Sequence, residues 1–506
     1  MLFNSFTYLL FLPLVVILHW LLPKSFRKTL LLVASYIFYM HWMPKYGLLI
    51  LALTLINYGF GLAINAAQVQ KRKKTFLVVG IVLNLSCLCF FKYTGFIVAS
   101  IFDSLKVVSP TLGVHTLDAA TSPALKIILP LGISFFTFEF IHYITDVYRG
   151  SAPIRNIRDF ALFAAFFPSQ IAGPIKRFQD FVAQLKEAST FSAAYFHEGI
   201  FLILQGLFKK VALGDNLGAL VNAGYAGIHT LNTVDAWITV SAFTLQLFFD
   251  FAGYTDIGRG SALLLGYKVP ENFNWPYLAA NLTEFWHRWH ISLSTWLRDY
   301  LFIPLGGSRG SPWLTRRNTF LTMVLGGLWH GASWNFVFWG AFHGTGLVLS
   351  KDWHNFVTKV PYLAKLRPHP VWHCAGVFST VFFWLLTGVL FRAATLPEAL
   401  NMGQNLFFNQ TANATTTSLA GGQICTQFLE STIPAALIIY AIFCLGKYFV
   451  SKLDDVQIAN PLKAFKTIIE WTRQSTPFKL VSCLFVAVLI LGFAPSQVIP
   501  FIYFQF

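Results

Sequence analysis

Residues 281–344 read NLTEFWHRWHISLSTWLRDYLFIPLGGSRGSPWLTRRNTFLTMVLGGLWHGASWNFVFWGAFHG. Of the thirteen histidines in the chain, four fall in this stretch: His287, His290, His330 and His343. A basic loop joins an aromatic, histidine-bearing first part to a strongly apolar second part, which contains His330. A titratable ring deep in lipid is costly, so it marks a candidate functional site. We therefore interpret the rest of the chain as scaffolding around His330.

The composition is that of a membrane protein. Hydrophobic residues make up 56% of the 506 residues and charged residues only 11%, and the mean hydropathy is +0.59. A soluble domain carries roughly 25% charged residues, and the apolar runs here approach the ~20 residues that cross a bilayer as helix. Open sheets are excluded in lipid, and the runs do not alternate as barrel strands do. We predict an all-α polytopic bundle of about eleven spanning helices, plus re-entrant and interfacial helices.

The basic residues predict the orientation of the chain. The net charge of +16 comes from 37 Lys and Arg against 21 Asp and Glu, and the basic residues cluster in loops, which signals membrane orientation rather than nucleic-acid binding. The dense cluster Lys71–Lys74 predicts a cytoplasmic loop and, by counting spans, both termini outside. The run 3–22 lacks a basic region before it and predicts a retained helix, not a signal peptide. The predicted external loop 397–432 holds glycosylation-type sequons at Asn409 and Asn413.

The apolar part of the central stretch predicts a hairpin. Arg316 and Arg317 before it and Lys351 after it indicate that both of its ends are cytoplasmic. About thirty apolar residues lie between them, so the chain must turn inside the membrane, and the small residues in 329–333 tolerate a turn. This geometry places His330 near mid-membrane at a backbone break, where transporters expose polar groups to a cavity. The alternative is a structural histidine that only forms a hydrogen bond with a neighbouring carbonyl.

Two further histidines precede the hairpin. His287 and His290 are three residues apart and share a face if 282–300 is one helix, and the sequence leaves either of them as the inward one. Three tryptophans of this segment look like an interfacial aromatic belt: Trp286, Trp289 and Trp296. The histidines lack the spacing and carboxylate partner of a zinc site, and the six cysteines give neither a metal site nor a disulfide framework. No metal is therefore predicted.

Other polar groups interrupt the apolar runs. The motif FDFAGYTD at 249–256 ends an apolar run and predicts either a polar pocket or a cap for the next helix. Its polar members are Asp250, Tyr254 and Asp256. Glu139 and Asp146 are seven residues apart and share a helix face, inside the bundle or at its wet edge. The run 160–172 is too short to span and fits a re-entrant or interfacial segment.

The chemistry that a buried histidine suits is general-base catalysis, because its pKa lies near the operating pH. His330 could take the proton of a hydroxyl as that oxygen attacks a thioester carbonyl, and such help is worth ~10²–10⁴-fold. The chain has no nucleophile elbow or serine triad motif. A base-assisted acyl transfer without a covalent intermediate is the simplest mechanism.

Short motifs follow one another along the chain to about residue 350: LPLGISFF (129–136), FFP with IAGP (166–168 and 171–174), GLFKK (206–210), FDFAGYTD (249–256), PENFN (270–274), FWHRWHISLS (285–294) and LWHG (328–331). In this order they resemble the membrane-bound O-acyltransferase (MBOAT) family, and within it the branch that O-acetylates bacterial exopolysaccharides such as alginate. The C-terminal third is matched only in general character.

The resemblance implies roles for particular residues. The family's essential histidine corresponds to His330, and its second polar position to His290, 40 residues earlier (330 − 290). In this branch an arginine often stands where this chain has His287. The implied tunnel through the bundle has six further candidate residues: Asp250, Tyr254, Asp256, His287, Trp329 and Asn335.

The resemblance also implies substrates and partners. The donor is a thioester, acetyl-CoA, which reaches the tunnel from the cytoplasm, and no cofactor is bound. The acceptor is a hydroxyl on an exported polysaccharide, or on a periplasmic SGNH-type partner that acetylates it. The location is the bacterial inner (cytoplasmic) membrane. We expect one integral membrane domain over 1–506, with N-terminal helices in 1–124, a catalytic core in 125–350 and C-terminal helices in 351–506.

Two alternatives compete with polysaccharide acetylation. One is D-alanyl transfer to teichoic acid from a carrier-protein thioester, against which the longer C-terminal region argues. The other is an acyl conduit or transporter without chemistry, in which His330 serves as a proton relay.

Overall fold

A computed structural model describes residues 1–112, 127–171, 173–187 and 190–408, with positions 433–434, 437, 486–490, 492–494 and 501 near the C-terminus. Over these ranges the regular elements are all helices, and no strand is present. The sequons at Asn409 and Asn413 and most of the C-terminal spans expected beyond residue 433 lie outside the described residues. The all-α prediction is confirmed.

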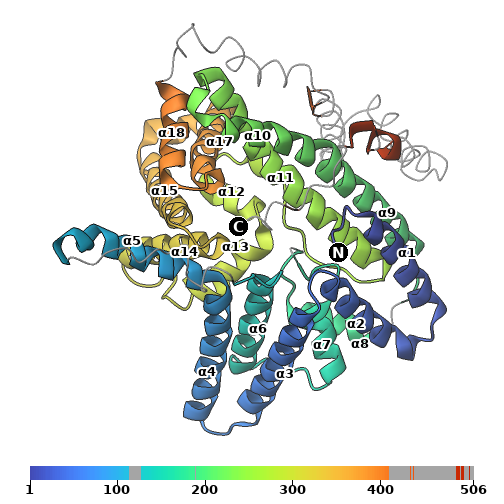
Figure 1. Cartoon of the computed structure of the whole chain (residues 1–506). Helices are drawn as coiled ribbons and strands as arrows, with labels where there is room; N and C mark the ends of the chain where they lie inside the picture. Colours follow the sequence, from blue (N-terminus) through green and yellow to red (C-terminus); the bar gives the residue numbers. More distant parts are fainter. Residues whose placement is uncertain are drawn as a thin grey trace.

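The N-terminal part begins with four helices, of which the first lies within the predicted run 3–22: α1 (Phe6–Leu21), α2 (Lys24–Met40), α3 (Lys45–Ala66) and α4 (Gln70–Leu88). The chain then passes through η1 (Cys89–Tyr93), a π-helical turn, and continues as α5 (Thr94–Leu112). In Figure 1 α3 and α4 project together from the lower edge of the bundle, beside α6.

The middle of the chain forms the body of the bundle. Its elements are α6 (Ile133–Tyr148), α7 (Ile157–Ala165), α8 (Phe178–Lys186), α9 (Ala193–Leu207), η4 (Phe208–Asp215), α10 (Asn216–Ala226), η5 (Ile228–Thr230) and α11 (Thr233–Leu264). With nine residues, α7 is too short to cross a bilayer, as predicted. The 32-residue α11 is largely buried, and in Figure 1 it runs beside α9 across the molecule.

The third part carries the histidines. It contains η6 (Pro276–Leu278), α12 (Leu282–Arg288), α13 (Ile291–Leu297), η7 (Arg298–Phe302), α14 (Pro312–His330), α15 (Trp334–Lys359), α16 (Pro361–Leu366), α17 (Pro370–Arg392) and α18 (Leu396–Phe407). The predicted hairpin is confirmed: α14 ends at His330, and α15 begins four residues later.

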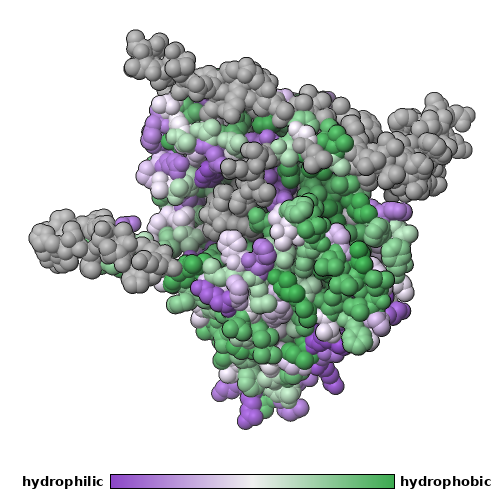
Figure 2. Space-filling view, turned by 45° about the vertical axis from the view of Figure 1, so that its right-hand side comes forward, coloured by the Kyte–Doolittle hydropathy of each residue, from purple (hydrophilic) through white to green (hydrophobic). Residues whose placement is uncertain are grey.

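The outer surface is that of a membrane protein. Among the described residues, four helical segments are long and apolar enough to cross a membrane: Lys45–Ala66, Gln70–Leu105, Thr233–Leu264 and Pro370–Arg392. The expected total of about eleven spans is not confirmed. Figure 2 shows a broad hydrophobic surface, with hydrophilic residues at the lower tip, where α3 joins α4, and at the upper left. Exposed side chains such as Leu48 and Phe378 are therefore expected to face lipid.

Candidate functional site

His330 lies at the turn of the α14–α15 hairpin. It is the last residue of α14, and Gly331 follows it in an extended conformation that ends the helix. Its side chain is buried, because only 5% of the residue is exposed. Glycines bring the two helices of the hairpin close together: a Cβ on Gly327 would lie 2.3 Å from the carbonyl oxygen of Phe336, and one on Gly340 would lie 2.4 Å from that of Met323. The position of His330 thus depends on direct backbone contact between the helices.

Aromatic side chains surround the imidazole of His330. The ring centroids of Trp329, Trp339 and Phe391 lie 4.9, 5.2 and 5.3 Å from it, all at steep angles to its plane. Phe391 belongs to α17, beyond the core expected to end at residue 350. His343, one turn beyond Trp339 on α15, is also buried, and its Nε2 lies 3.1 Å from the hydroxyl of Thr387.

His290 lies at a second break in the backbone. The expected helix over 282–300 is wrong as a single element, because the chain turns between α12 and α13 and His290 adopts left-handed angles of φ +42° and ψ +54°. A non-glycine residue in that region costs about 1–3 kcal/mol and persists where its surroundings fix it. Here Asn272 fixes it: its carbonyl accepts from the amide of Ile291 (3.0 Å), and its side chain accepts from the hydroxyl of Ser292 (2.7 Å). The PENFN and FWHRWHISLS motifs therefore meet in space.

The break decides which histidine faces inward. His290 is fully buried, and its ring lies 4.7 Å from that of Phe251 and 6.3 Å from that of Trp329. Neither ring nitrogen of His290 has a hydrogen-bond partner among the residues that the structure describes. His287 is exposed, so the two histidines do not share a face.

The predicted aromatic belt is also wrong. Trp286, Trp289 and Trp296 are 7%, 2% and 8% exposed and pack inside the protein rather than along its rim. Trp296 stacks on Phe138 of α6 at 3.8 Å, and Phe138 stacks on Trp329 at 5.0 Å. These rings form a column that ends beside His330.

The FDFAGYTD motif lies within α11 and caps nothing, so the capping alternative is wrong. Asp250 forms a buried ion pair with Lys210 (2.8 Å), and Asp256 forms one with Lys209 (2.7 Å). Gly253 lets the end of α9 and the start of η4 approach, since a Cβ there would lie 2.6 Å from the carbonyl oxygen of Gly206 and 2.8 Å from the backbone nitrogen of Lys210. The motif thus joins the GLFKK motif through two ion pairs.

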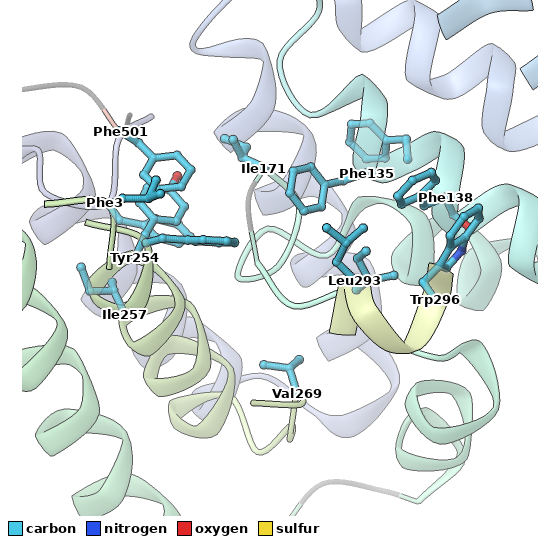
Figure 3. Close-up of a cluster of buried hydrophobic side chains, with 14 of the residues drawn as sticks. Phe3, Phe135, Phe138, Ile171, Tyr254, Ile257, Val269, Leu293, Trp296 and Phe501 are labelled. Atoms are coloured by element: carbon cyan, nitrogen blue, oxygen red, sulfur yellow. The ribbon is translucent and has the colours of Figure 1, made fainter. Parts of the chain in front are cut away.

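Tyr254 lies between the rings of Phe3 and Phe501, stacked at 4.3 and 4.5 Å. Figure 3 shows this stack on one side of a buried apolar cluster and the Phe138–Trp296 stack on the other, with α11 and α6 supplying the two sides. Asn335, another tunnel candidate, is buried and donates to the carbonyl of Ala393 (2.7 Å), which ties α15 to the end of α17.

The end of the aromatic column at Tyr300 is basic. Trp296 contacts Tyr300 at 5.4 Å, and the guanidinium carbons of Arg149 and Arg177 lie 5.1 and 5.9 Å from the Tyr300 ring. The carboxylate of Asp299 is bound by Arg177 and Arg298.

Sequence reasoning missed two charged contacts near the site: those of Lys92, which is half-buried, and the pairing of Glu139 with a lysine. Lys92 of η1 donates to the carbonyl oxygens of Trp329 and His330, and Glu139 forms a 2.7 Å ion pair with Lys176, both partners buried. A signal for the first existed, since Lys92 is the one charged residue between positions 75 and 102. The second pairs residues 37 positions apart, and no local pattern marks it. Within the described ranges, no group of three or more His, Cys, Asp and Glu side chains could hold a metal ion.

Comparisons with known proteins identify the family. Residues 152–393 match the model of MBOAT, the membrane-bound O-acyltransferase family. The chain is 38% identical to the "Probable alginate O-acetylase AlgI" of Azotobacter vinelandii over the whole of both chains. It is 34% identical to the peptidoglycan O-acetyltransferase of Helicobacter pylori over 74% of this chain and 73% of the relative. It is 30% identical to the teichoic acid D-alanyltransferase of Bacillus subtilis over 53% and 69%, respectively. This chain belongs to the membrane-bound O-acyltransferase family and is a membrane O-acyltransferase.

Proposed function

We propose that this enzyme moves an acetyl group from cytoplasmic acetyl-CoA to a hydroxyl on the outer side of the bacterial inner membrane. The acceptor is an exported polysaccharide, or a periplasmic SGNH-type partner that then acetylates it. His330 and His290 carry the reaction. The observation on which the proposal rests is the placement of the His330 imidazole, at the turn of an apolar hairpin and about 20 Å along the helix from Arg317 (13 residues).

The reaction needs one base and one acyl transfer. A nitrogen of the His330 ring accepts the proton of the acceptor hydroxyl while its oxygen attacks the thioester carbonyl. A carbon–oxygen bond forms, the carbon–sulfur bond breaks, and the proton leaves on the thiol of coenzyme A. His290 is the second polar group, with its ring 6.3 Å from that of Trp329, and its ring nitrogens would hold the donor carbonyl or the acceptor hydroxyl.

The basic cluster at the Tyr300 end of the aromatic column, which we propose to be the cytoplasmic end, supports a phosphorylated donor. Three arginines (Arg149, Arg177 and Arg298) surround two carboxylates (Asp146 and Asp299), which leaves one net positive charge. Guanidinium groups bind phosphate oxygens well. The ring column between Tyr300 and His330 is apolar, which suits the acetyl group of the donor.

The inner-membrane orientation with both termini outside stays a proposal that the ion pairs support. Lys28, in the first turns of α2, pairs with Asp159 (2.9 Å), and Arg149 donates to the carbonyl of Asp299 (3.0 Å). Both contacts join segments that we propose to be cytoplasmic, which supports this orientation. We treat 1–506 as one membrane domain and propose that its core extends beyond residue 350, because Phe391 contacts the His330 ring.

The names of the relatives support acetyl transfer. Full-length similarity is to a protein named for alginate acetylation, and similarity over three quarters of the chain is to one named for peptidoglycan acetylation. The D-alanyltransferase relative aligns with about half of the chain.

The test is transfer of label from acetyl-CoA in proteoliposomes that hold the purified protein. His330→Ala is expected to abolish transfer while the protein stays folded and inserted, and His354→Ala, on the exposed end of α15, is the matched control. Full transfer by the His330 variant would refute the enzymatic role. Transfer that requires a soluble acylated carrier protein would instead favour D-alanyl chemistry.

A further inference from the structure

The long helix formed by α4 and α5 is interrupted at one place. Five residues, Cys89–Tyr93, form a π-helical turn within the candidate span Gln70–Leu105. Such turns are rare and occur often at functional sites. The turn carries Lys92, and a charged side chain within an apolar span is costly enough that it marks function by default.

The turn contacts the helix end that carries His330. The ammonium of Lys92 donates to the carbonyl oxygens of Trp329 and His330, the latter at 3.0 Å, and the hydroxyl of Tyr93 donates to the carbonyl of Leu328 at 2.8 Å. Two consecutive residues of one helix therefore bind three consecutive carbonyls of another, more than 230 positions away in the chain.

These carbonyls are the ones that a helix leaves without an internal partner. The last four carbonyls of an α-helix lack intrahelical donors, and lipid offers them none. The end of a helix also carries partial negative charge, which a cation stabilises. Lys92 thus provides the end of α14 with both a hydrogen-bond donor and a positive countercharge. This end of the helix is His330, the residue whose ring carries the proposed chemistry.

We propose that Lys92 and Tyr93 are positioning residues, which fix the imidazole of His330 by holding the backbone of its own helix turn. This inference rests on the proposed role of His330. Lys92 binds backbone oxygens rather than reacting atoms. Its loss is expected to leave the donor site intact and to let the last turn of α14 move.

The test compares four variants for kcat and for the KM of acetyl-CoA. Lys92→Met keeps the length of the side chain and removes its charge and donors, and Lys92→Arg restores both. Tyr93→Phe removes only one hydroxyl. Lys28→Met is the matched control, because it removes a lysine from an ion pair with Asp159 at the inner face.

We expect Lys92→Met to lower kcat about 10- to 100-fold, since a displacement of about 1 Å at a catalytic group costs ~10²-fold. The KM for the donor should stay within about twofold, and Lys92→Arg should recover most of the activity. A loss of folding alone would not lower kcat per folded molecule while leaving KM unchanged. Tyr93→Phe is expected to lower kcat less, in the same direction. Lys28→Met should match the unmodified protein.

Two outcomes separate this inference from the proposed function. If His330→Ala is inactive while Lys92→Met and Tyr93→Phe keep normal kcat, the positioning role is refuted and the base stands. If His330→Ala keeps full activity, the proposed function itself is refuted. Should Lys92→Met not fold, an unchanged kcat for Tyr93→Phe or an inactive but folded Lys92→Arg overturns the inference.

Discussion

Gly327→Ala tests whether the close packing of the hairpin sets the position of His330. The added methyl would lie 2.3 Å from the carbonyl oxygen of Phe336 and 2.9 Å from the Cα of Gly340, whereas carbon–oxygen contacts between helices lie at about 3.3 Å or more. Helices α14 and α15 must therefore separate by about 1 Å. Overpacking of this kind costs about 1–3 kcal/mol, and a 1 Å shift of a catalytic group costs ~10²-fold in rate.

The adjacent glycine provides the control. A Cβ on Gly326 would meet only the Cδ1 of Leu297, at 3.2 Å, and that side-chain end can move. Alanine also favours helix by about 1 kcal/mol over glycine, so Gly326→Ala should equal or exceed the unmodified protein in stability. The assay is acetyl transfer in proteoliposomes together with the melting temperature in detergent. Equal activity for Gly327→Ala and Gly326→Ala would refute the reasoning.

Further predictions concern the two other buried features beside the site. His290→Gly should melt at a higher temperature than His290→Ala, because glycine avoids a left-handed penalty of about 1–2 kcal/mol; both should lose transfer activity, and a more stable alanine variant would contradict the strained geometry. Lys176→Met should destabilise the protein by about 3–5 kcal/mol, because it leaves the carboxylate of Glu139 buried without its cation. The double variant with Glu139→Leu should recover most of that loss in denaturant or thermal unfolding, whereas equal losses for single and double variants would show that charge burial is not the cause.

Much of the architecture followed from the order of apolar runs and basic loops. The hairpin at His330 was predictable because Arg316, Arg317 and Lys351 require both ends on one side of a run too long for one short helix. Helix α7 was correctly predicted not to span the membrane, because its apolar run is shorter than the thickness of a bilayer. Such arguments use only local composition and the solvent that surrounds it.

The errors occurred where distant segments decide the conformation. The turn at His290 depends on Asn272, 18 residues earlier, and no periodicity in 282–300 announces it. The tryptophans predicted to lie at the membrane rim are covered by α6 and α17, so their amphipathic chemistry misled the prediction. The acids of FDFAGYTD left a capping role open beside a polar pocket, because their lysine partners lie about 40 residues away, in η4.

The amino-acid sequence alone determined that this protein is a helical membrane protein. It also determined that the apolar run around His330 turns back on itself, and that His330 lies at that turn. Burial in lipid forces those results, since every backbone group must be hydrogen-bonded within its own segment and an exposed charge is costly there. Only the tertiary structure decided that His290 rather than His287 faces inward and that Lys92 holds the end of α14. Those contacts join segments 40 to 240 residues apart, and their strength depends on distances that chain order does not encode.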